Sequence, residues 1–177
     1  MALWPDAPQS DPVRMQDYEV HEESRIAQVT AVVRSTLAVE EIGPWLKNSY
    51  GDIDRVLSER QAGPTGPPFA RYRMLGGGRF EIEAGFPATS PIDPVGDVGP
   101  SELPGGQVAV TVHIGPYDAM EPAYKALETW VNEHGGKVGD PWEVYFSDPS
   151  TDPAGWRTEI VQPFRPAEPE LPSGDSR

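Results

Sequence analysis

The sequence predicts an α+β fold in which one strand–helix–strand–strand module occurs twice. Three observations support this prediction. β-Branched residues gather in runs of strand length. One helical pattern of apolar residues follows the first such run in each half, and the order of elements in residues 17–90 is repeated in residues 103–164. We therefore expect antiparallel sheets covered by helices.

In the first module, residues 26–34 are rich in Val and Thr and are expected to form a strand. The Gly43-Pro44 pair is expected to break or kink the helix that follows, because proline lacks a backbone donor. Residues 69–75 and 79–86 are expected to form a hairpin, with Gly76-Gly77-Gly78 as its turn. The apolar residues of the helix are Val39, Ile42, Leu46, Ile53, Val56 and Leu57.

In the second module, apolar residues alternate along residues 107–114, as expected of a strand with one buried face. Asp118 and Glu121 have the spacing of a capping box at a helix start, and Gly135-Gly136 is expected to end that helix. Residues 142–147 and 156–164 are typical of two closing strands. The inward face of the helix is expected to carry Met120, Ala123, Tyr124, Leu127, Val131 and His134.

Proline-rich segments frame and join the two modules. Residues 1–16 are expected to form an irregular N-terminal arm, and residues 165–177 a polar C-terminal tail. Residues 87–106 are rich in Pro and Gly and are expected to be a linker between the halves. The folded domain is thus expected to span residues 17–164.

The composition restricts the function. The chain has 177 residues, no cysteine and a formal net charge of -14. This acidity disfavours binding to nucleic-acid phosphates and favours cationic partners. The first residues lack the basic and apolar regions of a secretory signal, and no apolar run reaches the roughly 18–20 residues that span a bilayer. We therefore expect a cytoplasmic protein that binds neither nucleic acid nor membrane.

Each closing strand carries one glutamate among large aromatic residues: Glu143 lies in residues 141–146 and Glu159 in residues 156–161. Burying a glutamate inside an apolar strand is costly unless the side chain has a partner or faces a cavity. Strand alternation places Glu143 and Tyr145 on one face and Trp142 on the other. The pattern predicts the floor of a pocket for a flat, positively charged organic molecule.

The second half also contains a series of short motifs in a fixed order. They are Leu103-Pro104-Gly105-Gly106, Val112-His113-Ile114-Gly115-Pro116-Tyr117, Trp142-Glu143-Val144-Tyr145, Ser147-Asp148-Pro149 and Trp156-Arg157-Thr158-Glu159-Ile160. In these motifs residues 103–164 resemble the GyrI-like small-molecule-binding family, whose domain also forms the effector-binding part of bacterial multidrug-responsive regulators. Residues 18–90 resemble that family in element order rather than in motifs. No helix-turn-helix or basic recognition helix is found, so the chain resembles the stand-alone members.

The resemblance implies a central cleft between the two modules that binds bulky, planar, often cationic compounds. The family's glutamate and the pocket side chain two residues later correspond to Glu143 and Tyr145. The aromatic residue that opens the last strand corresponds to Trp156, and the acidic residue of that strand to Glu159. Tyr72, Phe86, Trp45, Tyr117 and Trp142 are further candidates for aromatic contacts with a ligand.

The two glutamates suggest why a cation would be preferred. If the closing strands pair, Glu143 and Glu159 are expected to lie near each other. Two close carboxylates repel, which raises one pKa unless a cation arrives. Aromatic walls would add stacking and cation–π contacts of roughly 0.5–2 kcal/mol each.

Other interpretations stay open for the same residues. Glu143 and Glu159 are also compatible with a solvated strand face or an ion pair with Arg157 or Arg73. If the protein is an enzyme, Glu143 would act as a base and Tyr145 or Tyr117 as a proton donor in the hydrolysis of a cyclopropane-bearing or other electrophilic toxin. A third hypothesis is an acidic protein that interacts with gyrase. Trp130, Tyr124 and Leu127 are expected to be core residues.

No cofactor or metal is expected. His21, His113 and His134 lack the spacing of metal ligands. No G-K-[ST] sequence follows the three glycines at 76–78, as a phosphate-binding loop requires, and no G-x-S-x-G motif is present. The leading hypothesis is therefore sequestration or sensing of aromatic, cationic or toxic small molecules.

Overall fold

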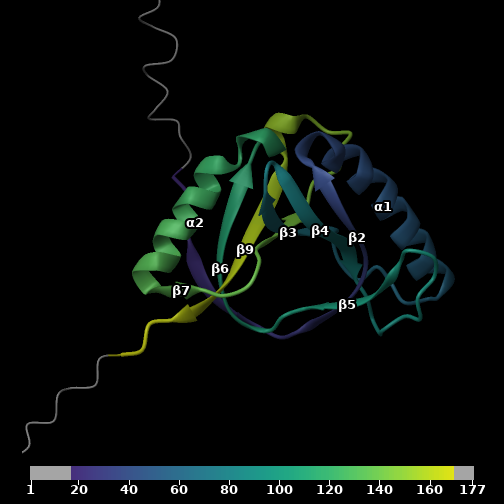
Figure 1. The fold of residues 1–177 in the computed structure, drawn as a ribbon, viewed down its shortest axis with the longest axis horizontal. Coiled ribbons are helices and arrows are strands. Elements are labelled where there is room, and N and C mark those ends of the chain that lie inside the picture. The colour runs from purple at the N-terminus through teal and green to yellow at the C-terminus, as the bar shows by residue number, and fades with distance from the viewer. Residues whose placement is uncertain (1–16, 170–177) are drawn as a thin grey trace, which may run out of the picture.

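The structure is a computed structural model that describes residues 17–169. These residues form nine strands and two α-helices (Figure 1). The arm expected at residues 1–16 lies outside the described residues, as does most of the expected tail. The strands are β1 (His21–Arg25), β2 (Gln28–Ala38), β3 (Phe69–Gly76), β4 (Arg79–Pro87), β5 (Gly99–Leu103), β6 (Gly106–Ile114), β7 (Gly135–Lys137), β8 (Trp142–Tyr145) and β9 (Arg157–Pro166), and the helices are α1 (Val39–Glu59) and α2 (Glu121–His134).

The expected duplication is confirmed by the order of the strands. The first module is β2-α1-β3-β4 and the second is β6-α2-β8-β9, with the short β7 added beside β9. The antiparallel sheet has the order β1-β6-β9-β8-β3-β4-β2-β5. Inward from β6, the sheet contains the first, third and second strands of the second module; inward from β2, it contains the first, third and second strands of the first module. The two modules meet where β3 pairs with β8.

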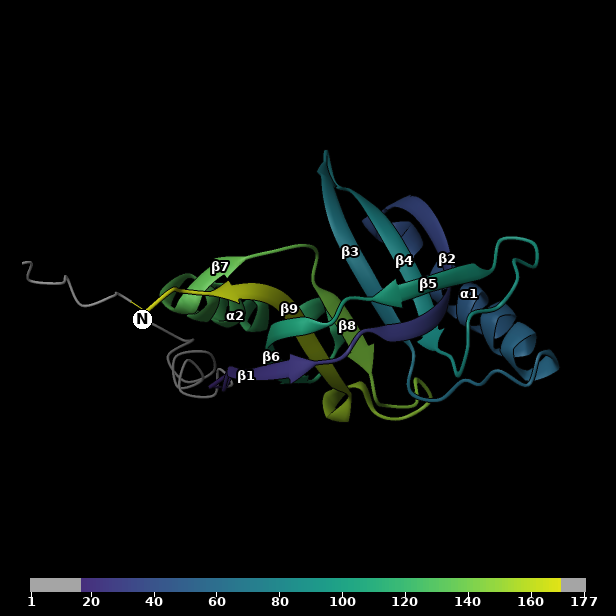
Figure 2. The same ribbon diagram turned by 90° about the horizontal axis from the view of Figure 1, so that it is seen from below.

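One long ladder joins the ends of this sheet. β1 pairs with β6 and β2 with β5 in a single register, in which His21 lies opposite Val110 and Gln28 opposite Leu103. Figure 2 shows that β1 leads directly into β2, and β5 into β6. The sheet therefore curls into a half-barrel. Its inner face buries a core made of Val32, Phe69, Leu103, Val108, Val110, Trp142 and Val161.

Three short strands were not predicted. β5 lies inside the stretch expected to be a linker, so that expectation was wrong. β1, β5 and β7 contain Glu, Gly or Pro, which are depleted in strands. Their pairing is determined by the neighbouring strands rather than by local propensity.

Helix α1 is continuous from Val39 to Glu59, so the break expected at Gly43-Pro44 does not occur. Proline removes one backbone donor from the second turn of the helix. The helix buries Ile53, Val56 and Leu57 at its C-terminal half. Packing of this apolar face against the sheet stabilises the helix despite the missing hydrogen bond.

The capping box expected for α2 is wrong. Asp118 lies in a separate 3₁₀ turn, and α2 begins at Glu121 with no side-chain cap. Pro122 stands in the first turn, where its fixed φ favours helix initiation. The end of the helix at Gly135 is confirmed. His134, expected on the inward face, is exposed, whereas Ala123, Leu127 and Val131 are buried there.

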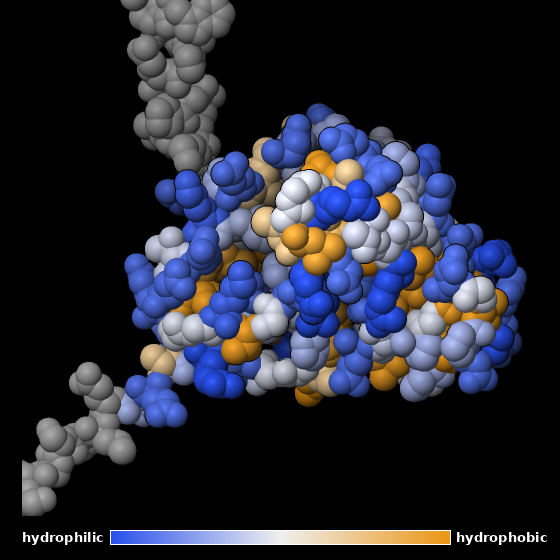
Figure 3. All heavy atoms as spheres, viewed as in Figure 1, coloured by the Kyte–Doolittle hydropathy of each residue, from blue (hydrophilic) through white to orange (hydrophobic). Residues whose placement is uncertain are grey.

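The surface is predominantly hydrophilic on the face that Figure 3 shows, with small apolar patches between the polar side chains. Neither helix of the described residues has the length and apolarity needed to cross a bilayer.

Candidate functional site

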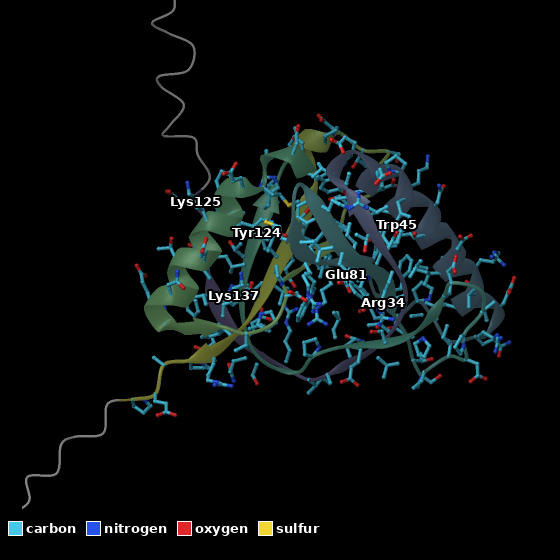
Figure 4. All side chains as sticks on the ribbon, viewed as in Figure 1. Arg34, Trp45, Glu81, Tyr124, Lys125 and Lys137 are labelled. Carbon is cyan, nitrogen blue, oxygen red and sulfur yellow. The ribbon has the colours of Figure 1, made fainter. Side chains whose placement is uncertain are left out.

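A cleft of about 1370 Å³ lies between the two helices, on the face of the sheet opposite the inner core. Its walls come from α1 and from α2 with the turn before it, and its floor from β3, β4 and β8. Figure 4 labels Trp45 on α1 and Tyr124 on α2, on opposite sides of the strands. The cleft thus lies at the seam of the two modules.

Glu143 lies on the floor of this cleft and is only 6% exposed. The Tyr124 hydroxyl, from α2, donates a hydrogen bond to Oε2 of Glu143. The Tyr145 hydroxyl donates to Oε1 at 2.9 Å, and the Tyr72 hydroxyl lies 2.7 Å from that of Tyr145. Because Tyr145 gives its only proton to Glu143, Tyr72 is the donor to Tyr145. The three hydroxyls therefore all direct their protons toward one carboxylate.

The electrostatic surroundings of Glu143 do not favour its charge. Burial raises the pKa of the Glu143 carboxyl above its ordinary value, although hydrogen bonds from Tyr124 and Tyr145 lower it in part. Among the described residues, no Lys or Arg lies within ion-pairing distance of this carboxylate. Glu143 is therefore a buried acid held by neutral donors, with no cation to compensate the negative form.

A ring of tyrosines surrounds the acid. Tyr50 reaches in from α1, and its hydroxyl is fixed by a 2.7 Å hydrogen bond to the carbonyl of Phe69. The Tyr50 and Tyr145 rings meet edge to face at 6.5 Å. Burial raises the pKa of both phenols well above the ordinary value, so both stay neutral. Further apolar lining comes from Ile42, Leu46, Met74, Phe80, Met120 and Leu127.

Charged side chains line the rest of the cleft. The acidic ones are Asp118, Glu121, Glu128 and Asp140, and the basic ones are Lys47, Arg73 and Lys137. Glu121, Tyr124 and Glu128 follow one another at helical spacing, so α2 contributes both acidic and aromatic groups to its wall. With Glu143 included, acidic groups outnumber basic ones in the lining.

Four residues selected from the sequence line the cleft: Glu143, Tyr145, Tyr72 and Tyr117. Of these, Tyr117 is the most exposed, at 38%. Its ring packs against Tyr145 at 5.3 Å, so it lies at the entrance beside the buried acid. Their role in binding stays a prediction.

Three other aromatic candidates lie behind the lining. Trp156 stacks on Tyr117 with ring centroids 4.6 Å apart and an interplanar angle of 27°. Phe86 meets Tyr50 edge to face at 5.5 Å. Trp45 packs in the cluster that contains Ile82 and Tyr145. These three side chains support cleft residues rather than forming the lining itself.

Trp142 and Glu159 are on the other face of the sheet. Trp142 is buried in the inner core and does not line the cleft. Glu143 lies opposite Ile160, and Glu159 lies opposite Val144. The expected pair of neighbouring carboxylates is therefore wrong, because the strand register places the two glutamates on opposite faces. Glu159 instead forms a 2.9 Å ion pair with Arg25.

Sequence reasoning missed Tyr124 and Tyr50. Tyr124 was assigned to the core because helical periodicity showed only that it faces inward. Leu127 and Tyr124 both pack in the apolar cluster beneath α2 and also line the cleft, and the Tyr124 hydroxyl reaches Glu143. No sequence signal showed that the inward face of this helix also borders a cleft.

The arrangement can accept a flat, positively charged group against Glu143, between tyrosine rings. It also has the parts of a general base, because a carboxylic acid of raised pKa is adjacent to phenol donors. Among the described residues, no group of three or more His, Asp or Glu side chains is placed to hold a metal ion.

Comparison with known families gives one match. The GyrI-like small molecule binding domain matches residues 75–165, which include β4 to β9 and the second module. No curated protein matches the sequence.

Solved structures with the same fold are of low identity. The C-terminal domain of EcmrR is 20% identical with a TM-score of 0.69, covering 86% of this chain and all of that domain. In an EcmrR–DNA complex, identity is 19% and TM-score 0.71, and the match covers 90% of this chain but 62% of that one. SAV2435 bound to tetraphenylphosphonium is 12% identical with a TM-score of 0.58, covering 85% and 94%. A hydrolase from Listeria innocua is 8% identical with a TM-score of 0.57, covering 89% and 98%.

These likenesses support the fold. Because one of the structures is a complex with DNA, the expectation that nucleic acid is no partner stays a prediction.

Proposed function

The chain belongs to the GyrI-like small-molecule-binding domain family, and from this premise we propose that its cleft binds bulky, planar, hydrophobic organic cations. The observation that supports the cationic preference is the state of Glu143. It is buried, is held by Tyr124 and Tyr145, and has no cationic side chain within ion-pairing distance among the described residues. A bound cation would supply the missing compensating charge.

The size and lining of the cleft support a bulky aromatic ligand. Its volume of about 1370 Å³ exceeds the roughly 300–1,000 Å³ typical of small-molecule sites. Tyrosine faces and apolar side chains from both modules surround the acid. Stacking and cation–π contacts have weak directional requirements, so several related ligands would be accepted.

One structural relative supports the same ligand class. SAV2435 has been solved with tetraphenylphosphonium, a large aromatic cation. In this chain the corresponding role would be sequestration or sensing of such compounds in the cytoplasm. In a longer regulator, the same domain would act as the effector-binding part.

A fluorescence titration with ethidium, a planar aromatic cation, tests the proposal. We expect saturable binding by the parent protein and at least about tenfold weaker binding by Glu143→Gln, because removing one member of a buried charge pair typically costs ~2–5 kcal/mol. Glu159→Gln is the matched control, since it removes a carboxylate from the other face of the same sheet. Its ethidium affinity should stay within about twofold of the parent's, a difference well under 1 kcal/mol.

Equal ethidium affinity for the parent and Glu143→Gln would falsify the role of the carboxylate. Binding of a neutral planar dye, Nile red, separates charge from shape. Glu143→Gln should leave Nile red affinity unchanged if its effect on ethidium is electrostatic.

A hydrolase is the second candidate, and one observation favours it. The 2.9 Å hydrogen bond between Tyr145 and Glu143 links a base to a proton donor in the cleft. Glu143 would take a proton from water while the water oxygen attacks a carbon of a strained cyclopropane and a ring C–C bond breaks. Tyr145 would protonate the carbon that leaves and would recover a proton from Glu143, so that one water is added in total.

Mass spectrometry distinguishes the two candidates. A binder returns a cyclopropane-bearing electrophile intact, whereas a hydrolase converts it to a product heavier by one water. Product that forms with the parent and is lost in both Glu143→Gln and Tyr145→Phe would support the hydrolase. Intact compound after prolonged incubation would exclude it.

A further inference from the structure

A second, polar cavity of about 100 Å³ is lined by residues of β2, β3 and β4 and by Asp140, and it shares Tyr72, Arg73 and Asp140 with the lining of the cleft. Its charged lining consists of Arg34, Arg71, Arg73, Glu81, Glu83 and Asp140. In the strand register, Arg71 of β3 lies opposite Trp142 on one side and Glu83 on the other. Figure 4 labels two members of the group, Arg34 and Glu81, on the first module. Because Arg71 lies opposite Trp142 in this register, it is on the same face of the sheet as Trp142, away from the cleft that contains Glu143.

All the carboxylates of this cavity are engaged by the other two arginines. Arg34 contacts Glu83 at 2.8 Å, and Ser101 bonds to both of them. Arg73 contacts Asp140 at 3.0 Å and Glu81 at 3.7 Å. The first pair connects β2 with β4, and the others connect β3 with β4 and with the segment before β8. They leave no carboxylate for the third arginine.

Arg71 has no such partner. Among the described residues, no carboxylate oxygen lies within ion-pairing distance of its guanidinium. Its Nε is fully buried and makes no hydrogen bond. A buried donor without an acceptor is destabilising, and in native proteins such a group usually finds one in the protein, in an ordered water or in a bound ion.

We propose that Arg71 binds a small planar carboxylate of the size of acetate in this cavity. The guanidinium fork matches the two oxygens of a carboxylate, so Nε and one terminal nitrogen can donate in parallel. The volume corresponds to about three water molecules at roughly 30 Å³ each, which limits the ligand to a few heavy atoms. Arg34 and Arg73 pair with all three carboxylates of the lining, so Arg71 is the arginine whose charge one bound monoanion would compensate locally.

NMR of the arginine Nε–H groups tests the proposal in the whole protein. Sodium acetate is added while sodium chloride is reduced, so that ionic strength stays constant. We expect one resonance, absent from Arg71→Gln, to shift in a saturable way. Arg71→Lys keeps the charge but loses the fork, and should bind acetate about tenfold more weakly because one charge-assisted hydrogen bond is lost.

Arg55→Gln is the matched control, because Arg55 is an exposed arginine of α1 that does not line the cavity. It should bind acetate as the parent does. Phosphate, which is tetrahedral and larger, should compete only weakly. A shift that chloride reproduces, a shift that does not saturate, or equal acetate binding by Arg71→Lys would overturn the proposal. The comparison of acetate binding between the parent and Arg71→Lys does not depend on whether Arg71→Gln folds.

Discussion

The Tyr124 hydroxyl on α2 donates a hydrogen bond to the Glu143 carboxylate on β8. This contact joins the helix wall of the cleft to its floor. Tyr72 of the first module reaches the same carboxylate through Tyr145, at 2.7 and 2.9 Å. One buried acid is therefore bound by groups from both modules, at the β3–β8 pair where the modules meet.

The surroundings of Glu143 lead to a prediction about pH. Its pKa is raised, so below that pKa the cleft holds a neutral acid and above it a carboxylate. We predict that ethidium affinity increases as pH rises from about 4.3, the ordinary pKa of glutamate, through the raised value. The groups that face Glu143 are Tyr124, Tyr145, Tyr72, Tyr50 and Tyr117, whose pKa values are raised, so they stay neutral over this range.

Fluorescence titrations at a series of pH values check this dependence. Glu143→Gln should show a markedly weaker pH dependence of ethidium binding than the parent. A parallel pH profile for the parent and Glu143→Gln would show that another group titrates.

The same pKa shift predicts the pH dependence of stability. A carboxyl whose pKa is higher in the folded than in the unfolded protein stabilises the fold at low pH. That contribution is present below the unfolded value of about 4.3 and is lost as pH rises through the folded pKa. The free energy of unfolding of the parent should therefore fall relative to that of Glu143→Gln as pH rises over this window.

Urea denaturation of both proteins at several pH values measures the difference. Glu143→Gln keeps an acceptor and donors for the surrounding hydroxyls, so we expect it to fold. A difference in unfolding free energy that does not change with pH, or that changes in the opposite direction, would contradict the raised pKa.

The sequence was sufficient for the elements with strong periodicity. Alternating valines identified β6, and the spacing of Ala123, Leu127 and Val131 identified the buried face of α2. Alternation along β8 also correctly separated Glu143 from Trp142. In these segments the local pattern and the tertiary packing agree.

The remaining features depend on contacts between distant segments. The predicted position of Glu159 was wrong because the loop before β9 determines the register between β8 and β9. A shift of one residue in that register moves a side chain to the other face of the sheet. β5 has the sequence Gly-Pro-Ser-Glu-Leu and becomes a strand through its pairing with β2. The cleft, similarly, exists only because two modules meet, and neither half contains a signal for its shape.

The stacking of Trp156 on Tyr117 predicts an indirect effect on binding. Trp156 does not line the cleft, but its ring lies 4.6 Å from that of Tyr117, which does. A stacked aromatic pair contributes ~0.5–1.5 kcal/mol, or about two- to tenfold. We expect Tyr117→Ala to weaken ethidium binding by the larger factor, and Trp156→Ala by the smaller one.

A double-mutant cycle separates a direct contact from a supporting one. If Trp156 acts by holding Tyr117, Trp156→Ala should have little further effect in the Tyr117→Ala background. Additive losses would instead mean that Trp156 touches the ligand itself.

A substitution at Gly105 tests how strongly the fold depends on the ladder in which β1 pairs with β6 and β2 with β5. Gly105 lies between β5 and β6, beside the bend between β1 and β2, and a Cβ at this position would be 2.7 Å from the backbone nitrogen of Ala27. Backbone atoms cannot yield as a flexible side chain can, so the two paired segments would have to separate. We expect Gly105→Ala to reduce the free energy of unfolding by about 1–3 kcal/mol, the usual cost of overpacking.

Gly99→Ala is the matched control, because it lies in β5 of the same ladder and a Cβ there meets nothing within 4 Å. It should change stability little in urea denaturation. The ladder joins the two modules on the face of the sheet opposite the cleft. Gly105→Ala should therefore also weaken ethidium binding, whereas Gly99→Ala should not. Equal unfolding free energies for the two variants would show that the bend can widen without loss, and that the ladder does not determine how the modules meet.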